Sequence, residues 1–175
     1  MGSGNVATGY KALYNNTTGS YNVAIGDSTA ANYSTGSNLV AIGSKALYSN
    51  TTGIYNTALG NEALYLNVSG SANTALGFES MNKNTASQNT AVGFSAMSES
   101  TNGDNNTAIG SYALQNNGPN ADHNVAIGVL ALQANSGIFN IGIGNEALRQ
   151  TSGNANIGIG NWALRANASG LVNIG

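Results

Sequence analysis

Charge is the scarcest property of this 175-residue chain. Asp, Glu, Lys and Arg together make up 7% of its residues, against about 25% in typical soluble domains. The formal net charge is −2, and the five basic residues are scattered along the chain. Electrostatic binding of nucleic acid needs a cluster of Lys and Arg to neutralise phosphates, so we expect no nucleic-acid partner.

Several chemistry-bearing features are also missing. Cysteine is absent, which excludes disulfides, cysteine zinc sites and thiol chemistry. The only histidine, His123, stands between Asp122 and Asn124, a setting typical of a solvated loop rather than a general base. The seven carboxylates are scattered, and the Gly-Gly-x-Gly-x-Asp phrase of calcium-binding solenoids does not occur. We therefore predict no enzymatic activity, no cofactor and no metal. No stretch approaches the roughly 18 consecutive apolar residues of a membrane span, so no membrane insertion is expected.

What the chain has in abundance is Asn (29 copies) and Gly (24 copies), together with a recurring phrase. The phrase is Asn, then Val, Thr or Ile, then Ala or Gly, then an aliphatic residue, then Gly. Because the apolar residues keep one phase throughout, a disordered linker is excluded, and stacked supersecondary units are indicated. The glycine that ends the phrase recurs every 16 to 18 residues, at positions 9, 26, 43, 60, 77, 93, 110, 128, 144 and 160.

Each unit predicts one coil of a solenoid. In the unit 56–72, Asn56 to Leu59 alternate as a short strand does, and Gly60 permits a bend. The pair Ala63-Leu64 predicts a second short strand, and a polar turn follows it. Seventeen residues are too few for a strand plus a helical crossover. We therefore predict an all-β, parallel β-solenoid of about ten 16–18-residue coils over residues 4–175, with residues 1–3 as a short lead-in.

The phase of each residue predicts what stacks on what. We expect two columns inside the coil, the one that runs from Val23 through Thr57 to Ile157 and the one that runs from Ile25 to Ile159. The small Ala and Gly column between them, from Ala24 to Gly158, is interpreted as the place where identical chains pack, or else as facing the opposite wall of its own coil. The first residue of each phrase is expected to form a ladder of side-chain amides that bond from coil to coil. Its members are Asn22, Asn56, Asn73, Asn89, Asn106, Asn124, Asn140 and Asn156, with Leu39 as the exception in the third coil.

The phrases Tyr21-Asn22-Val23-Ala24-Ile25-Gly26 and Asn105-Asn106-Thr107-Ala108-Ile109-Gly110 resemble the head repeats of trimeric autotransporter adhesins. The stretch 56–64 is similar to repeats of bacteriophage tail-fibre proteins. The resemblance extends over nearly the whole chain. It implies a left-handed β-roll, a homotrimer that is intertwined or side by side, a location outside the cell, on a cell surface or on a virion, and a role in attachment. The period of about 17 is longer than that of adhesin heads, so the return turn must be longer.

A surface column follows the second apolar pair of each unit. Aromatic rings and guanidinium groups in a row can stack on sugars or bind acidic glycans, so a host-surface glycan or protein is a candidate partner. The alternative is that the tyrosines pack along a subunit seam and the arginines only solubilise the rod. The candidate residues in this column are Tyr14, Tyr48, Tyr65, Arg149 and Arg165.

Two other functions remain open. Neither end carries a polar capping unit, so we expect either a segment of a longer fibre, which is favoured, or coils of one molecule that stack on the next and make the chain a filament subunit. A column of Thr57, Thr74, Thr90 and Thr107 also suggests an ice- or crystal-binding surface, although a single column interrupted by Val and Ile fits an internal position better.

Overall fold

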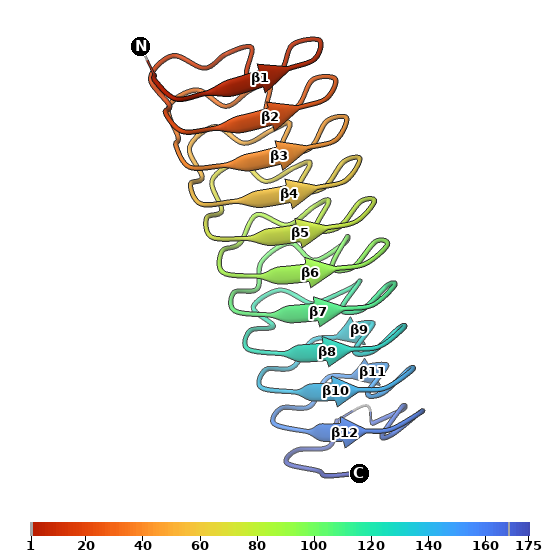
Figure 1. The fold of residues 1–175 in the computed structure, drawn as a ribbon. Helices are drawn as coiled ribbons and strands as arrows, with labels where there is room; N and C mark the ends of the chain where they lie inside the picture. The colour runs from red at the N-terminus through yellow and green to blue at the C-terminus, as the bar shows by residue number, and fades with distance from the viewer. Residues whose placement is uncertain (1, 168) are drawn as a thin grey trace.

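The computed structural model describes residues 2–167 and 169–175, which contain strands and turns and no helix. Ten strands form one sheet in the order β1-β2-β3-β4-β5-β6-β7-β8-β10-β12, and two more form a second sheet (Figure 1). The main-sheet strands are β1 (Val6–Thr8), β2 (Val23–Ile25), β3 (Val40–Ile42), β4 (Thr57–Leu59), β5 (Thr74–Leu76), β6 (Thr90–Val92), β7 (Thr107–Ile109), β8 (Val125–Ile127), β10 (Ile141–Ile143) and β12 (Ile157–Ile159). The second sheet pairs β9 (Ala134–Asn135) with β11 (Gln150–Thr151).

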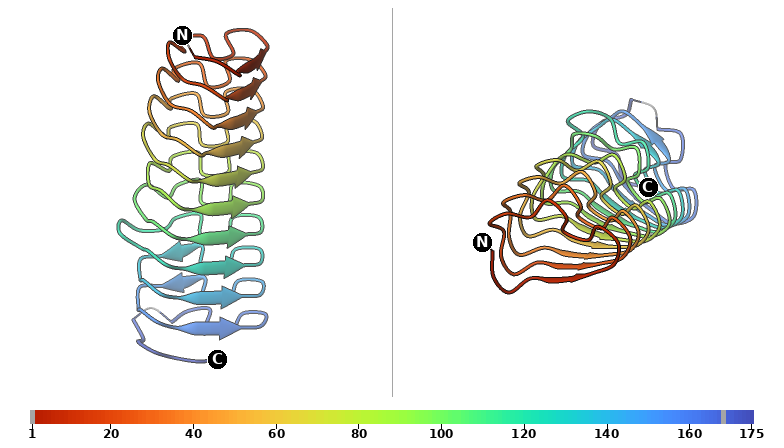
Figure 2. Two further views of the ribbon diagram at one scale, coloured as in Figure 1. Left: turned by 60° about the vertical axis from the view of Figure 1, so that its left-hand side comes forward. Right: turned by 90° about the horizontal axis from the view of Figure 1, so that it is seen from above.

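Every strand pair is parallel and in register, so residues of one phase lie above one another. Val23 pairs with Val40, and Ala24 pairs with Ala41. Seen from the N-terminal end, the chain runs counterclockwise as it moves away from the viewer, so the coil winds to the left (Figures 1 and 2). Nine steps separate the ten strands, which gives a rod roughly 43 Å long at about 4.8 Å a step. The parallel β-solenoid predicted from the repeat is confirmed.

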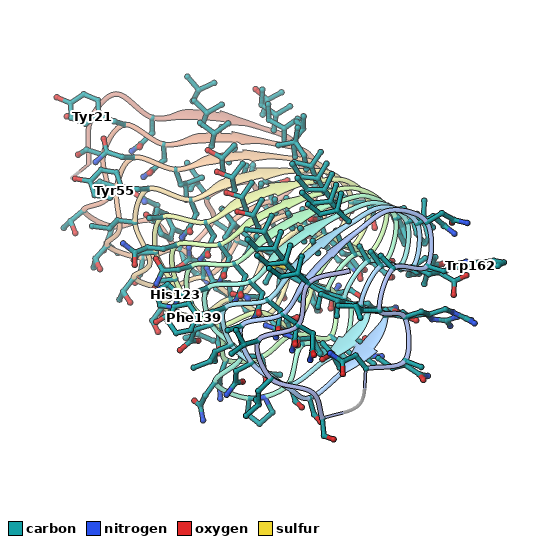
Figure 3. The ribbon with its side chains drawn as sticks, turned by 90° about the horizontal axis from the view of Figure 1, so that it is seen from below. Tyr21, Tyr55, His123, Phe139 and Trp162 are labelled. Carbon is teal, nitrogen blue, oxygen red and sulfur yellow. The ribbon has the colours of Figure 1, made fainter. Side chains whose placement is uncertain are left out.

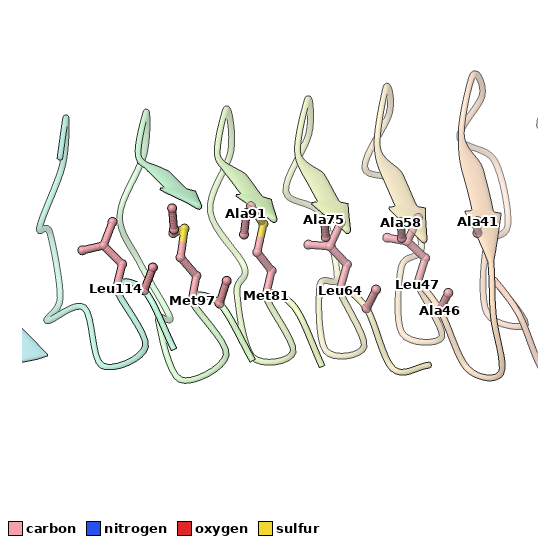
Figure 4. Close-up of a cluster of buried hydrophobic side chains, with 14 of the residues drawn as sticks. Ala41, Ala46, Leu47, Ala58, Leu64, Ala75, Met81, Ala91, Met97 and Leu114 are labelled. Carbon is pink, nitrogen blue, oxygen red and sulfur yellow. The ribbon is translucent and has the colours of Figure 1, made fainter. Parts of the chain in front are cut away.

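The core is a thin layer between two walls. In every main-sheet strand except β1, the middle residue points inward and is buried, as are most of the alanines and the larger side chains of the opposite wall. Figure 4 shows Ala58, Ala75 and Ala91 facing Leu64 and Met81 across this layer. A small side chain on the strand wall is therefore required, because a large one faces it.

The prediction of which columns lie inside was wrong. The columns headed by Val23 and Ile25 stand on the outside of the main sheet, half-buried or exposed, and the Ala column between them is inside. Since successive strand residues point to opposite faces, both flanking residues must leave the core when the middle one enters it. The alternative reading, that Ala faces its own opposite wall, is correct. Copies of the chain cannot meet at Ala residues that a single chain already covers.

The predicted second strand is also absent at Ala63-Leu64, where the chain forms turns. Leu64 has a φ of 52°, a left-handed conformation that no strand contains. The pair is nevertheless buried, and the N–H of Leu64 donates to the carbonyl of Ser80 in the next coil. The second wall thus stacks through hydrogen bonds in the same way as the strands, without strand dihedral angles.

Tight stacking explains the glycine that ends each strand. Gly60 has a φ of 143°, and a Cβ placed on it would collide with the carbonyl oxygen of Gly77 one coil away. Both the dihedral angle and the lack of space therefore require glycine at this phase.

Candidate functional site

The outer face of the main sheet extends over all ten of its strands. We define it by the first and third residues of the ten strands, from Val6 and Thr8 to Ile157 and Ile159. Its side chains form two parallel rows along the rod (Figure 3). Neither row contains a charged residue, and the third position is aliphatic in every strand except β1. Leu59 and Ile109 remain about 40% exposed in the single chain. The repeat thus builds an uncharged, mainly aliphatic strip over the full length of the sheet.

The four threonines of the first row lie near the middle of this face. Thr57, Thr74, Thr90 and Thr107 are partly exposed on adjacent strands β4 to β7. The expectation that they fit an internal position was therefore wrong, for the same reason of strand alternation. In each of these strands the second row carries Leu, Val or Ile beside the threonine.

The asparagine ladder lies inside the coil at the start of each strand, and its eight members are buried. Asn73 is representative, because its Oδ1 accepts the backbone N–H of Asn89 at 3.0 Å and its Nδ2 donates to the carbonyl of Ala86 at 2.8 Å. Bonds from one amide to the next, as the sequence suggested, occur at Asn124 and Asn156 in addition to the backbone bonds. The ladder mainly satisfies backbone groups that the three-residue strands do not reach.

A second buried asparagine column, which the sequence analysis missed, lies on the return wall. Asn50, Asn67 and Asn135 each accept a backbone N–H from a glycine two or three residues later, at 2.8 to 3.1 Å. The signal was present as Asn two or three residues before a turn glycine, a typical Asx-turn spacing. This burial places the Asn50 and Asn67 side chains out of reach of any modifying enzyme while the coil is folded.

The tyrosines of the candidate surface column are not equivalent. Tyr14 is 68% exposed, with the Lys11 ammonium 5.7 Å from its ring centroid. Tyr48 and Tyr65 are only partly exposed and stack on each other, with centroids 5.5 Å apart. One ring face of each is therefore already covered, which leaves Tyr14 as the tyrosine of this column most open to a ligand.

The two arginines of the column share one carboxylate. Arg149 Nη1 lies 3.0 Å from Glu146 Oε2, and Arg165 bonds the same oxygen. Partial desolvation raises the pKa of Glu146, but hydrogen bonds from Arg149 and Arg165 and their positive charges more than offset it, so the pKa is lowered. Arg149 also donates to Gln133 at 2.9 Å, which in turn bonds Gln115 at 3.0 Å. These groups mainly neutralise and bond one another along the rod.

Aromatic side chains gather at both edges of the outer face. Tyr21, Tyr55 and Phe139, next to His123, precede their strands on one side, and Trp162 lies beyond the other (Figure 3). On that other side Phe78 and Phe94 stack with centroids 5.3 Å apart, and Tyr112 meets Phe94 edge-on. All of these rings except Tyr112 and His123 are large apolar groups left exposed in the single chain.

A polar notch of about 250 Å³ lies at the return corner, lined by Ala86, Asn102, Gly103, Asp104, Asn120 and Asp122. It lies where a 16-residue coil and an 18-residue coil flank one of 17 residues. The Asp104 carboxylate accepts the N–H of Ser87, and the Asp122 carboxylate accepts that of Asp104. At the same phase in other coils, a serine hydroxyl accepts a backbone N–H of the adjacent coil, and the two carboxylates take the same role.

Comparison with known proteins assigns no relative, since no family model, curated protein or solved structure matches the chain. Within residues 2–167 and 169–175, no three His, Cys, Asp or Glu side chains come together as metal ligands. The same residues include no helix with the length and hydropathy that a bilayer span needs.

Proposed function

We propose that this chain is a structural and attachment module of an extracellular fibre, either an adhesin head or a phage tail-fibre shaft. In this proposal identical chains pack side by side as a homotrimer through the outer face. The observation that carries it is the uncharged, mainly aliphatic strip that extends over ten strands. Water-exposed apolar patches of this extent mark association surfaces in soluble proteins. The resemblance to adhesin and tail-fibre repeats supports the trimer and a location on a cell surface or virion, and the ten recurring glycines support the count of about ten coils.

The rod would act through geometry. Regular stacking makes it stiff, and the walls that do not face other copies project a repeated polar surface. Many weak contacts to a host glycan or protein would then add through multivalency, and no deep pocket is needed. Tyr14 is the candidate contact at the N-terminal end, because its ring is open to solvent.

A second candidate function is ice or crystal binding. Thr57, Thr74, Thr90 and Thr107 face outward on a regular sheet, which favours this hypothesis more than the sequence did. Against it, six of the ten members of the first row are Val or Ile, and the second row is aliphatic apart from Thr8. Ice binding would show as thermal hysteresis and faceted crystals in a freezing assay, and it requires the face to be free in solution.

The experiment that tests the proposal is light scattering across a dilution series of the full chain. A mass that stays at three times 17.6 kDa supports the trimeric fibre module. A mass that grows with concentration, with threads in micrographs, would favour the filament alternative. A stable monomer would overturn the proposed packing and leave the outer face open for ice binding.

A further inference from the structure

The chain contains two asparagines that are followed directly by glycine, in the pairs Asn102-Gly103 and Asn117-Gly118. In such a pair the backbone nitrogen of the glycine can attack the side-chain amide of the asparagine, because glycine has no Cβ to hinder the approach. The amide is then lost and an acid remains, which is one reason why asparagine counts as a thermolabile residue. In a folded chain the reaction is slow where hydrogen bonds hold the reacting groups.

Glycine is required at position 103, whereas asparagine is not required at position 102. A Cβ on Gly103 would lie 2.6 Å from the carbonyl oxygen of Ala121 one coil away, so stacking fixes the glycine. The other glycines of this turn column follow Thr or Ser, as in Thr52-Gly53 and Ser69-Gly70. Asn102 is therefore the exception in its column, and the rest of the column shows which residues the turn accepts in its place.

The side chain of Asn102 is open to solvent. Its Oδ1 lies 3.1 Å from the Thr85 hydroxyl, and its Nδ2, the group that would leave, donates no hydrogen bond to any residue that the structure describes. Asn102 lines the notch at the return corner and does not belong to the outer face. The packing of copies proposed above would therefore leave it accessible.

The attacking nitrogen is also unengaged. In an equivalent coil the N–H of Gly53 donates to the buried Oδ1 of Asn50 at 2.8 Å. At the phase of Asn50 the coil of Gly103 has Ser100, whose hydroxyl donates instead to the carbonyl of Leu114 at 3.0 Å. The N–H of Gly103 consequently donates no hydrogen bond within the described part of the chain.

The second pair is held on both sides. Asn117 is 5% exposed, and its Nδ2 donates to the carbonyl of Ala121 at 2.7 Å. The N–H of Gly118 donates to the carbonyl of Asn135 at 2.6 Å. The same two-residue sequence therefore occurs once with both reacting groups free and once with both engaged.

We propose that Asn102 is a site of spontaneous deamidation in the folded protein and that Asn117 is protected. The Gly103 nitrogen loses its proton to hydroxide and bonds to Cγ of Asn102. The bond from Cγ to Nδ2 breaks, ammonia leaves with a proton from water, and a cyclic succinimide remains. Water then opens the ring at either carbonyl and gives aspartate or isoaspartate. The net reaction consumes one water and releases one ammonia, with no change of oxidation state.

The product would alter the return corner. Its new carboxylate would line the same notch as Asp104 and Asp122, where like charges repel one another. Isoaspartate also adds a carbon to the backbone directly before Gly103, whose carbonyl accepts the ladder amide of Asn89 at 2.7 Å. Deamidation would therefore loosen this coil from its neighbour at one corner of the rod.

Peptide mass mapping of the full chain after incubation at mildly alkaline pH tests the proposal. In the folded chain Asn102 should convert at least about tenfold faster than Asn117, since Asn117 can react only in locally opened states. In urea, where both pairs are unfolded, the two should convert at comparable rates. An intact Asn102 in a folded sample, or equal rates at the two sites without urea, would overturn the proposal.

Variants separate the cause from the consequence. Ser100→Asn gives the N–H of Gly103 the partner that Gly53 has, and it should slow conversion of Asn102 roughly fivefold. Asn102→Thr places at this turn the residue that precedes Gly53, so it should keep the urea midpoint of unfolding and abolish the modification. Asn102→Asp represents one product and should lower that midpoint. Unchanged conversion in S100N would refute the role of the free N–H, and equal midpoints of N102D and N102T would refute the loosening.

Discussion

Asn73 illustrates how a residue that usually lies on protein surfaces becomes the most regular part of this interior. Its amide is fully buried and forms hydrogen bonds with two backbone groups that water would otherwise satisfy. A strand of three residues pairs few backbone groups, so the rest of the coil needs side-chain partners. Asparagine supplies a donor and an acceptor on one short stem, which fits the narrow space between coils.

The third coil shows how the ladder tolerates an exception. Leu39 replaces the asparagine, and Tyr33 occupies the second asparagine column one coil earlier, where it is fully buried. The Tyr33 hydroxyl donates to the Gly53 carbonyl at 3.0 Å. In other coils, the carbonyl at the equivalent position accepts its hydrogen bond from a ladder amide. Burial raises the pKa of this phenol. Two replacements therefore compensate each other, one apolar and one that carries the hydrogen bond.

Replacement of Asn73 by Ala should lower the free energy of unfolding by about 2–4 kcal/mol. The change leaves the N–H of Asn89 and the carbonyl of Ala86 without their side-chain partner, at roughly 1–3 kcal/mol for each buried group. Urea unfolding followed by circular dichroism measures the loss. Asn61→Ala, at an exposed position in the preceding coil, is the control and should change stability by less than about 0.5 kcal/mol. Similar losses in both variants would show that burial of the ladder amide does not matter.

At the scale of the element, each strand is short and is held by its ends as much as by its pairing. The strand alanine needs a small side chain because a leucine or methionine faces it. The glycine that follows has a left-handed φ and touches the backbone of the next coil. Between these two constraints the strand has little freedom to shift along its own direction, which is why ten strands keep one register.

The substitutions Gly60→Ala and Gly160→Ala separate two reasons for glycine after a strand, which are its left-handed φ and the lack of space for a Cβ. Both residues have similar φ values, 143° and 131°. A Cβ on Gly60 would collide with the Gly77 carbonyl, whereas a Cβ on Gly160 meets no atom within 4 Å. Gly160→Ala should therefore cost only the dihedral strain, about 1–3 kcal/mol, and Gly60→Ala should cost more. Thermal unfolding of the two variants compares them, and equal losses would mean that stacking distance plays no part.

At the scale of the whole molecule, the core is too thin to bury most of the chain's larger aliphatic side chains. The inner layer consists mainly of alanine, leucine and methionine, while many of the Val, Ile and Leu residues of the strands remain outside on one face. An isolated rod would leave this strip in contact with water, which is unfavourable in proportion to its area. Association through the outer face would remove that cost, and this is the physical basis of the proposed oligomer.

Leu59→Lys should weaken self-association while Leu66→Lys should not. The two leucines belong to one coil and are 41% and 40% exposed, but Leu59 lies on the outer face and Leu66 on the return wall. A lysine at the centre of an apolar contact has to be desolvated without a partner, so the oligomer of L59K should dissociate at a concentration at least about tenfold higher. Light scattering of both variants checks this. Equal behaviour of the two would remove the outer face as the contact surface.

The sequence alone determined the architecture, because a strict period of 16 to 18 residues with glycine at one phase allows little besides a stack of short coils. It also identified the asparagine ladder, since one polar residue recurs at one phase. Alternation alone, however, assigns residues to two faces without saying which face is inside. The sequence reading chose the more apolar columns for the interior, as is usual, and this was wrong.

Only the tertiary structure decided which face of each strand points into the core. The opposite wall contributes leucine or methionine, so the space left beside the strand fits alanine, and Val23 and Ile25 must point outward. The structure likewise brought Arg149 and Arg165 to one carboxylate, Glu146, which no spacing rule connects with both. Period and composition are properties of the chain, whereas the inside of a coil depends on the volumes of side chains that meet only after the coil has closed.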